Sequence, residues 1–108
     1  MITLQNERLT AVIANKGAEL QKLVNNRTGM NYMWSGDAKY WGKYSPVLFP
    51  VVGGLKDDTY YYKDRMYTLP RHGFARDKEF IGEQLNSTEA VFTLGHDEQT
   101  LAVYPFPF

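Results

Sequence analysis

Three basic side chains in two glycine-marked segments have the chemistry to bind a small polar molecule. Lys56 follows the Gly53–Gly54 pair in "VVGGLKDD", and His72 and Arg76 lie in "HGFARDKEF". These side chains donate hydrogen bonds to hydroxyl groups or anions, and loop residues positioned by a rigid sheet often carry function. The sequence therefore predicts His72, Arg76 and Lys56 as candidate binding residues.

Both segments also have a purely structural interpretation, which the residues alone leave open. Pro70 and Gly73 suit a tight turn, in which Arg76 pairs with a neighbouring carboxylate. Gly53 and Gly54 can mark a bulge or a turn and nothing more. A phosphate-binding loop is not predicted, because the chain has no GxxxxGK[ST] pattern.

The element between these segments decides whether they can act together. The residues "TYYYKDRMYTL" alternate around "KDR" and predict a β-hairpin from Thr59 to Leu69. A hairpin returns the chain to its starting point. We therefore expect the two flanking turns to lie side by side, with Lys56 near His72 and Arg76 at one end of the sheet.

The rest of the chain favours short antiparallel strands. Apolar and polar residues alternate in "ITL", "RLTAVIA" and "AELQKLVN". Pro50 cannot donate to a sheet ladder, so "PVLFPVV" is predicted as an edge strand or an extended loop. One short helical turn is predicted from Asp37 to Gly42, and no longer helix. Further strands are predicted for "EFIGEQL", "EAVFTL" and "TLAVYPF", which makes the fold class all-β and antiparallel.

Length and charge limit the partners. At 108 residues the chain is predicted to be a single domain, and its 12 Lys and Arg balance its 12 Asp and Glu. Because the chain has no net charge, no overall positive potential attracts a nucleic acid or an anionic membrane surface, and neither partner is expected. "MITLQNERLT" has no signal-peptide pattern, and no apolar run is long enough to span a membrane, so a cytoplasmic protein is expected.

Metal chemistry finds no support in the sequence. The chain has two histidines and no cysteine, and no metal site is predicted. His96, in "LGHDEQ", is predicted to be a solvated loop residue.

Aromatic residues gather in two places. Trp34, Tyr40, Trp41 and Tyr44 are predicted to pack in the core or over one end of the sheet, and the alternative is a platform that stacks on a sugar. The second group is the terminal "VYPFPF", which has no polar tail. Either this segment docks into a groove or the chain stops before its fold does.

Three blocks, "SPVLFPVVGGLKDD", "YTLPRHGFARDKEF" and "TLAVYPFPF", follow one another after the opening "LQNERLTAVIANKGAELQKLVNNRTGMNYMW". In this ordered set the sequence resembles the aldose 1-epimerase (galactose mutarotase) family, and most closely its LacX-type branch, over essentially the whole chain. The resemblance implies the N-terminal part of an antiparallel β-sandwich, the galactose mutarotase-like supersandwich. Residues 1–108 would then be a single, incomplete domain.

The resemblance also implies roles for the candidate residues. His72 matches the histidine of the family's "HGF" block, which contacts the hydroxyls or ring oxygen of a pyranose. Arg76 matches the arginine of "HGFAR", which lines the same pocket in phosphosugar-using relatives. Gly54 falls where many relatives carry a further substrate-contacting arginine, and Lys56 is the candidate replacement. The implied partner is a small sugar, either an aldose or a sugar phosphate.

The implied reaction is the interconversion of α and β anomers by acid- and base-assisted ring opening. In the family the base is a glutamate and the acid a histidine, and both lie in sequence beyond the "YPFPF" block. The resemblance thus assigns no catalytic residue and no cofactor to this chain, and implies that the chain alone is inactive. Two other functions remain open: a non-catalytic carbohydrate-binding module, and a structural piece that self-associates into a homo-oligomer through exposed strand edges.

Overall fold

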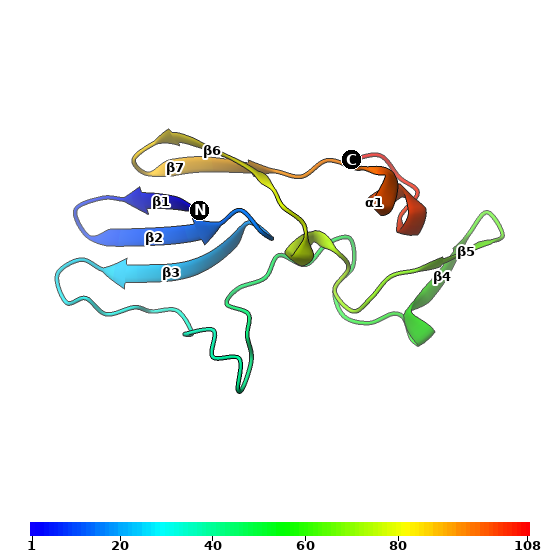
Figure 1. The fold of residues 1–108 in the computed structure, drawn as a ribbon, viewed down its shortest axis with the longest axis horizontal. Coiled ribbons are helices and arrows are strands. Elements are labelled where there is room, and N and C mark those ends of the chain that lie inside the picture. The colour runs from blue at the N-terminus through cyan, green and yellow to red at the C-terminus, as the bar shows by residue number, and fades with distance from the viewer.

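The computed structural model describes residues 1–108 as three small antiparallel sheets with one short helix. The strands are β1 (Ile2–Gln5), β2 (Leu9–Ala14), β3 (Glu19–Asn25), β4 (Thr59–Tyr62), β5 (Arg65–Thr68), β6 (Ile81–Asn86) and β7 (Glu89–Thr93), and the helix is α1 (Glu98–Val103). Figure 1 shows the β6–β7 hairpin beside β1 and the β4–β5 hairpin at the far end of the molecule. All pairings between these strands are antiparallel, so the predicted fold class is confirmed.

The first sheet has the order β1–β2–β3 and follows the alternation seen in the sequence. Ile2 lies opposite Ile13 and Leu4 opposite Ala11, so these four apolar residues share one face, while Val12 and Ala14 point to the other. The turn into β3 passes through Gly17, whose φ of 70° lies in the left-handed region.

The β4–β5 hairpin forms where the sequence predicts it. Its turn residues Lys63 and Asp64 both have positive φ, 48° and 60°, as a type I′ hairpin turn requires. Tyr60 lies opposite Tyr67 with the two rings stacked at 5.4 Å, while Tyr61 points to solvent. One face of the hairpin is therefore packed and the other is exposed.

The strand predicted for "TLAVYPF" is wrong, because the residues from Glu98 to Val103 form α1. The Asp97 carboxylate accepts a hydrogen bond from the Thr100 amide at 2.7 Å, and the Thr100 hydroxyl accepts one from the Asp97 amide at 2.9 Å. This reciprocal cap satisfies two backbone donors that a helix start otherwise leaves free. Thr100 is also fully buried, so local capping overrides the strand preference of Thr, Val and Tyr.

The loop between β3 and β4 holds the predicted helical turn but not the predicted core aromatics. The amides of Tyr40 and Trp41 donate to the Asp37 carbonyl at 3.0 and 2.9 Å, which confirms a single turn. Trp34, Tyr40 and Trp41 are exposed and only Tyr44 is half-buried, so the prediction that the four aromatics pack in a core is wrong for the first three. Trp34 instead donates its indole N–H to the Trp41 carbonyl at 2.8 Å.

The last residues dock against the rest of the chain. Phe106 packs on Tyr62 with ring centroids 4.8 Å apart, and Phe108 packs on Phe49 at 5.2 Å. The His96 side chain is exposed, as expected, but its Nδ1 accepts a hydrogen bond from the Phe108 amide at 3.1 Å. The "VYPFPF" segment is therefore docked, as the first alternative predicts, and these contacts do not test the second alternative.

The molecule is a thin, elongated layer. Its Cα atoms span 57 × 33 × 15 Å, and only 8 of 108 residues are buried, so few side chains are covered on both sides. The most deeply buried side chains of the second half include Leu69, directly after the β4–β5 hairpin, and Ala75, which are each 1% exposed. None of the helices has the length and apolar character needed to cross a membrane.

Candidate functional site

Two loop segments, residues 49–54 and 70–76, lie directly against each other, and we call them the paired turns. The His72 amide donates to the Gly53 carbonyl at 2.8 Å, and the Gly53 amide donates to His72 Nδ1 at 2.8 Å. The Phe49 carbonyl accepts from the amides of Phe74 and Ala75 at 3.0 and 3.1 Å. The structure thus brings the two glycine-marked segments together at the base of the β4–β5 hairpin.

Gly73 permits this close approach. Its φ is 72°, and a Cβ at this position would collide with the Phe49 carbonyl and lie 2.6 Å from Cδ of Pro50. His72 also has a positive φ, 68°, and the Phe49–Pro50 peptide bond is cis. The paired turns therefore depend on backbone conformations that ordinary strands do not use.

The hydrogen bond from Gly53 decides which nitrogen of His72 is free for a ligand. Because Nδ1 accepts a backbone N–H, the proton of the neutral imidazole lies on Nε2. No group of the chain accepts a hydrogen bond from Nε2. His72 is half-buried, and its ring presents one N–H donor held in a fixed orientation.

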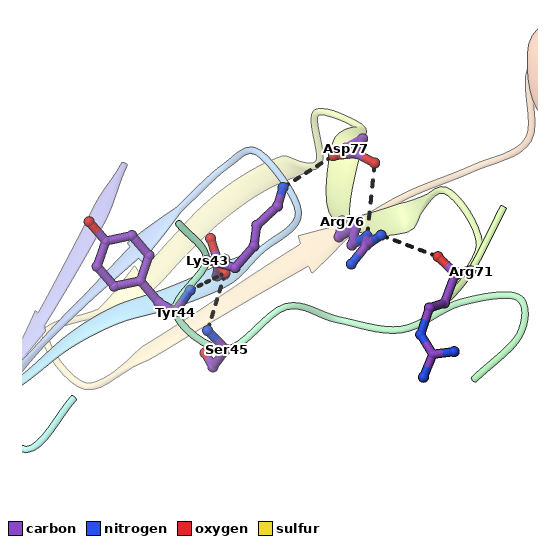
Figure 2. Close-up of polar contacts among 7 residues, drawn as sticks. Lys43, Tyr44, Ser45, Arg71, Arg76 and Asp77 are labelled. Atoms are coloured by element: carbon purple, nitrogen blue, oxygen red, sulfur yellow. Dashed lines mark hydrogen bonds and ion pairs between the residues drawn. The ribbon is translucent and has the colours of Figure 1, made fainter. Parts of the chain in front are cut away.

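Arg76 uses its guanidinium to hold the turn. Its Nη2 donates to the Arg71 carbonyl at 3.2 Å, and its Nε lies 4.0 Å from the Asp77 carboxylate, which is paired with Lys43 at 3.2 Å (Figure 2). The Nε atom is buried and has no hydrogen-bond partner. A direct contact between Arg76 and a ligand stays a prediction.

The first sheet supports the Arg76 backbone. The Gly17 amide donates to the Lys78 carbonyl at 2.8 Å, and a Cβ on Gly17 would lie only 2.7 Å from the Arg76 carbonyl oxygen. The 3₁₀ turn Ala75–Asp77 therefore rests against the turn between β2 and β3. A regular sheet thereby fixes one side of the paired turns.

Lys56, the third candidate, lies in the turn directly before β4. It begins the 3₁₀ turn Lys56–Asp58 and lines an open groove of about 410 Å³ with residues of the hairpin, among them Tyr61 and Met66. It makes no hydrogen bond or ion pair with His72 or Arg76. The structure brings the segments that contain His72 and the Gly53–Gly54 pair together, but no bond links the Lys56 side chain to His72 or Arg76.

Arg71 is a candidate that the sequence analysis missed. Its Nη1 lies 3.6 Å from the position that a Cβ on Gly54 would occupy, so the guanidinium lies over the opposite turn, residues 49–54. The side chain is exposed and makes no hydrogen bond or ion pair. In the sequence, only its position next to His72 in "PRHGF" could have indicated a binding role. Its proximity to Gly54 joins residues 17 positions apart, which no local pattern predicts.

Comparison with known proteins places the chain. The model of the aldose 1-epimerase family matches residues 1–108. The chain belongs to the aldose 1-epimerase family. It is 33% and 32% identical to the chromosomal and plasmid LacX proteins of Lactococcus lactis subsp. lactis, over 99% of this chain and 37% of each relative.

Solved structures agree with this family assignment. A galactose mutarotase-like protein from Lactobacillus casei superposes with a TM-score of 0.95 at 38% identity, over 99% of this chain and 36% of that one. A galactose mutarotase related enzyme from Lactobacillus acidophilus gives a TM-score of 0.96 at 40% identity, over 98% and 35%. The predicted galactose mutarotase-like β-sandwich class is thereby confirmed, and this chain spans little more than a third of those proteins.

A second cavity in this aldose 1-epimerase family chain has different chemistry. An apolar groove of about 410 Å³ lies between the paired turns and the β6–β7 hairpin, and it has no polar lining residue. Its seven lining residues are Val47, Phe49, Ala75, Phe80, Phe92, Leu94 and Phe108. A sugar needs hydrogen-bond partners for its hydroxyls, and the lining side chains of this groove supply none, so the paired turns remain the candidate site.

Proposed function

We propose that this chain is the sugar-binding N-terminal part of an aldose 1-epimerase-like protein, and that the paired turns contact an aldose. The observation that carries the proposal is the His72 ring, whose Nδ1 is held by the Gly53 amide. This bond leaves a fixed Nε2–H donor at the edge of the turn, and such a donor suits the ring oxygen or a hydroxyl of a pyranose. The family match over all 108 residues supports the assignment.

The whole protein's reaction would be the interconversion of α and β anomers. Ring opening needs a base at the anomeric hydroxyl and an acid at the ring oxygen. In this chain both histidines accept backbone N–H bonds through Nδ1, His72 from Gly53 and His96 from Phe108. Neither histidine pairs with a carboxylate. We propose that the isolated chain binds sugar weakly and does not catalyse, because its acid and base lie outside residues 1–108.

A mutarotation assay tests the catalytic half of this proposal. The rate of optical rotation change of α-galactose and of α-glucose is measured with and without the 108-residue chain. We expect the uncatalysed rate in both cases. Acceleration that disappears in a His72→Asn variant would contradict the proposal, because the acid and base would then lie within this chain.

Amide NMR tests the binding half. We expect galactose to shift the amide signals of Gly53 and His72 more than those of β2, because the paired turns hold the oriented Nε2–H donor of His72. An Arg27→Gln variant is a control for the loss of a positive charge elsewhere, because Arg27 lies on the turn after β3, in a groove that shares no residue with the paired turns. Shifts spread evenly over the molecule would contradict a site at the paired turns.

A second candidate function is self-association into a homo-oligomer, which the apolar groove and the open strand edges favour. The β4–β5 hairpin pairs with no third strand, and unpaired edges invite pairing with another chain. Light scattering over a range of concentrations measures this directly. A mass that stays at 12.5 kDa at high concentration would exclude it.

We further propose that residues 1–108 are a single incomplete domain and that the protein is cytoplasmic. The share of the relatives that the chain covers supports the first statement.

A further inference from the structure

Arg71 and Arg76 lie five residues apart but use their guanidinium groups differently. Arg76 donates to the Arg71 backbone carbonyl at 3.2 Å and has the Asp77 carboxylate within 4.0 Å. Figure 2 shows the Arg71 side chain extending away from these contacts, with no interaction drawn to its guanidinium. The positive charge of Arg71 is thus not matched by any group of the chain.

The Arg71 guanidinium forms no ion pair with any carboxylate of the chain. Lys43 and Arg76 share the single carboxylate of Asp77, at 3.2 and 4.0 Å. The other carboxylate nearby, that of Glu19, is buried and accepts two backbone N–H bonds at 2.8 and 3.1 Å. Neither of these carboxylates bonds to the Arg71 guanidinium.

The position of the guanidinium places it beside the proposed sugar donor. Arg71 Nη1 lies 3.6 Å from where a Cβ of Gly54 would be, and Gly54 has no side chain to cover it. The preceding residue, Gly53, holds the His72 imidazole. The Gly53–Gly54 turn therefore has the Arg71 guanidinium over Gly54 and the oriented His72 imidazole bonded to Gly53.

We propose that Arg71 recognises an anionic group, a phosphate or a carboxylate, on the sugar bound at the paired turns, and that Arg71 rather than Lys56 selects charged over neutral aldoses. The inference rests on the proposed sugar-binding function. A guanidinium presents a planar set of donors that binds an oxyanion through two parallel hydrogen bonds. Lys56 lies instead in the groove along the hairpin, without contact to His72.

The experiment compares four ligands on the 108-residue chain by amide NMR: galactose, galactose 6-phosphate, galacturonate and inorganic phosphate. Three variants each remove one positive charge: Arg71→Gln, Lys56→Gln and, as a distant control, Arg27→Gln. Arg71→Gln should keep the fold, because Arg76 bonds to the backbone carbonyl of residue 71 and not to its side chain. Unchanged signals in β1–β3 verify this.

We expect at least one charged sugar to bind more tightly than galactose. Arg71→Gln should weaken that charged sugar roughly tenfold, as the loss of a hydrogen bond to a charged group does, and should leave galactose within about twofold. Lys56→Gln and Arg27→Gln should leave both ligands unchanged. The ligand that depends most on Arg71, the phosphate or the carboxylate, identifies the anionic group.

The other outcomes separate this inference from the proposed function. Equal affinity for charged and neutral sugars, or an equal effect of all three substitutions, overturns the role of Arg71 while sugar binding stands. A charge preference lost only in Lys56→Gln overturns it in favour of Lys56. Binding of inorganic phosphate at Arg71 without binding of any sugar keeps the anion site and overturns the sugar proposal. No response to any ligand overturns both.

Discussion

The first sheet and the region that begins with the paired turns are held together by different means. β1, β2 and β3 pair through backbone ladders, with one register shift between Val12 and Ile13 on the side of β3. From Phe49 onward, only the β4–β5 and β6–β7 hairpins have backbone ladders, and the segments that connect them depend on left-handed residues and on bonds between side chains and backbone, such as Gly53 to His72 and Tyr60 to Val103. The three candidate binding residues, and Arg71, all lie in the second region.

The first sheet therefore serves as a scaffold, and the side chains that can bind a ligand lie in the second region. A ladder tolerates substitution at its exposed positions, because its bonds come from the backbone. The second region uses particular side chains and particular dihedral angles, so single substitutions there remove bonds that nothing replaces. The same irregular backbone leaves donors such as His72 Nε2 free, because they do not belong to a ladder.

Replacement of Gly73 by alanine should have the largest effect. The new Cβ overlaps the Phe49 carbonyl, and the alanine must also adopt a φ of 72°. Together the left-handed strain and the overlap should lower the free energy of unfolding by about 4 kcal/mol. Urea denaturation measures the loss, and the amide signals of Gly53 and His72 should shift first.

Gly29→Ala is the matched control, because Gly29 has nearly the same φ, 73°, but nothing within 4 Å of its added Cβ. Only the left-handed strain remains, so the expected loss is about 1 kcal/mol. Equal losses at the two positions would show that the contact between the paired turns contributes nothing beyond the backbone conformation.

His72→Ala should have the next largest effect. It removes the acceptor for the part-buried Gly53 amide, and an unpaired buried donor costs about 1–3 kcal/mol. His96→Ala is the parallel change at an exposed bond, where water can replace Nδ1 as acceptor for the Phe108 amide, so its cost should be smaller. Urea denaturation compares the two, and a larger loss for His96→Ala would reverse the ranking of these regions.

The sequence predicts the first region better than the second. The strands of β1–β3 and the Lys63–Asp64 turn follow from local alternation and turn chemistry, so they are predictable without a structure. The bond between Gly53 and His72 joins residues 19 positions apart, and no local pattern encodes it. α1 was missed because the strand preference of "TLAVY" hides the local cap from Asp97 to Thr100, although that pair was visible in the sequence.

Tyr60 tests how the hairpin is fixed to α1. Its hydroxyl donates to the Val103 carbonyl at 2.6 Å, and Tyr60→Phe should cost about 1 kcal/mol, the usual net worth of one hydrogen bond. Burial, followed by the charges of Tyr67 and Tyr104, raises the pKa of Tyr60 above 10.0. The neutral form is therefore favoured by folding, so this contribution is complete below pH 10.0 and is lost as the pH rises through the higher folded value. The wild-type chain should lose more stability than Tyr60→Phe in this alkaline window, and identical losses would contradict the assignment.

Asp97 should give the smallest effect, at the opposite end of the pH scale. The hydrogen bond from the Thr100 amide, aided by Lys78 at 3.2 Å, lowers the pKa of Asp97 below 3.8 although partial desolvation opposes it. Folding therefore favours the carboxylate, and its contribution is complete above pH 3.8 and is lost as the pH falls through the lower folded value. Asp97→Asn keeps a good helix cap but cannot titrate. Its unfolding free energy should change less between pH 5 and pH 2 than that of the wild-type chain. If both chains lose the same amount, the acid sensitivity lies elsewhere, and α1 depends on the burial of Thr100 rather than on its charged cap.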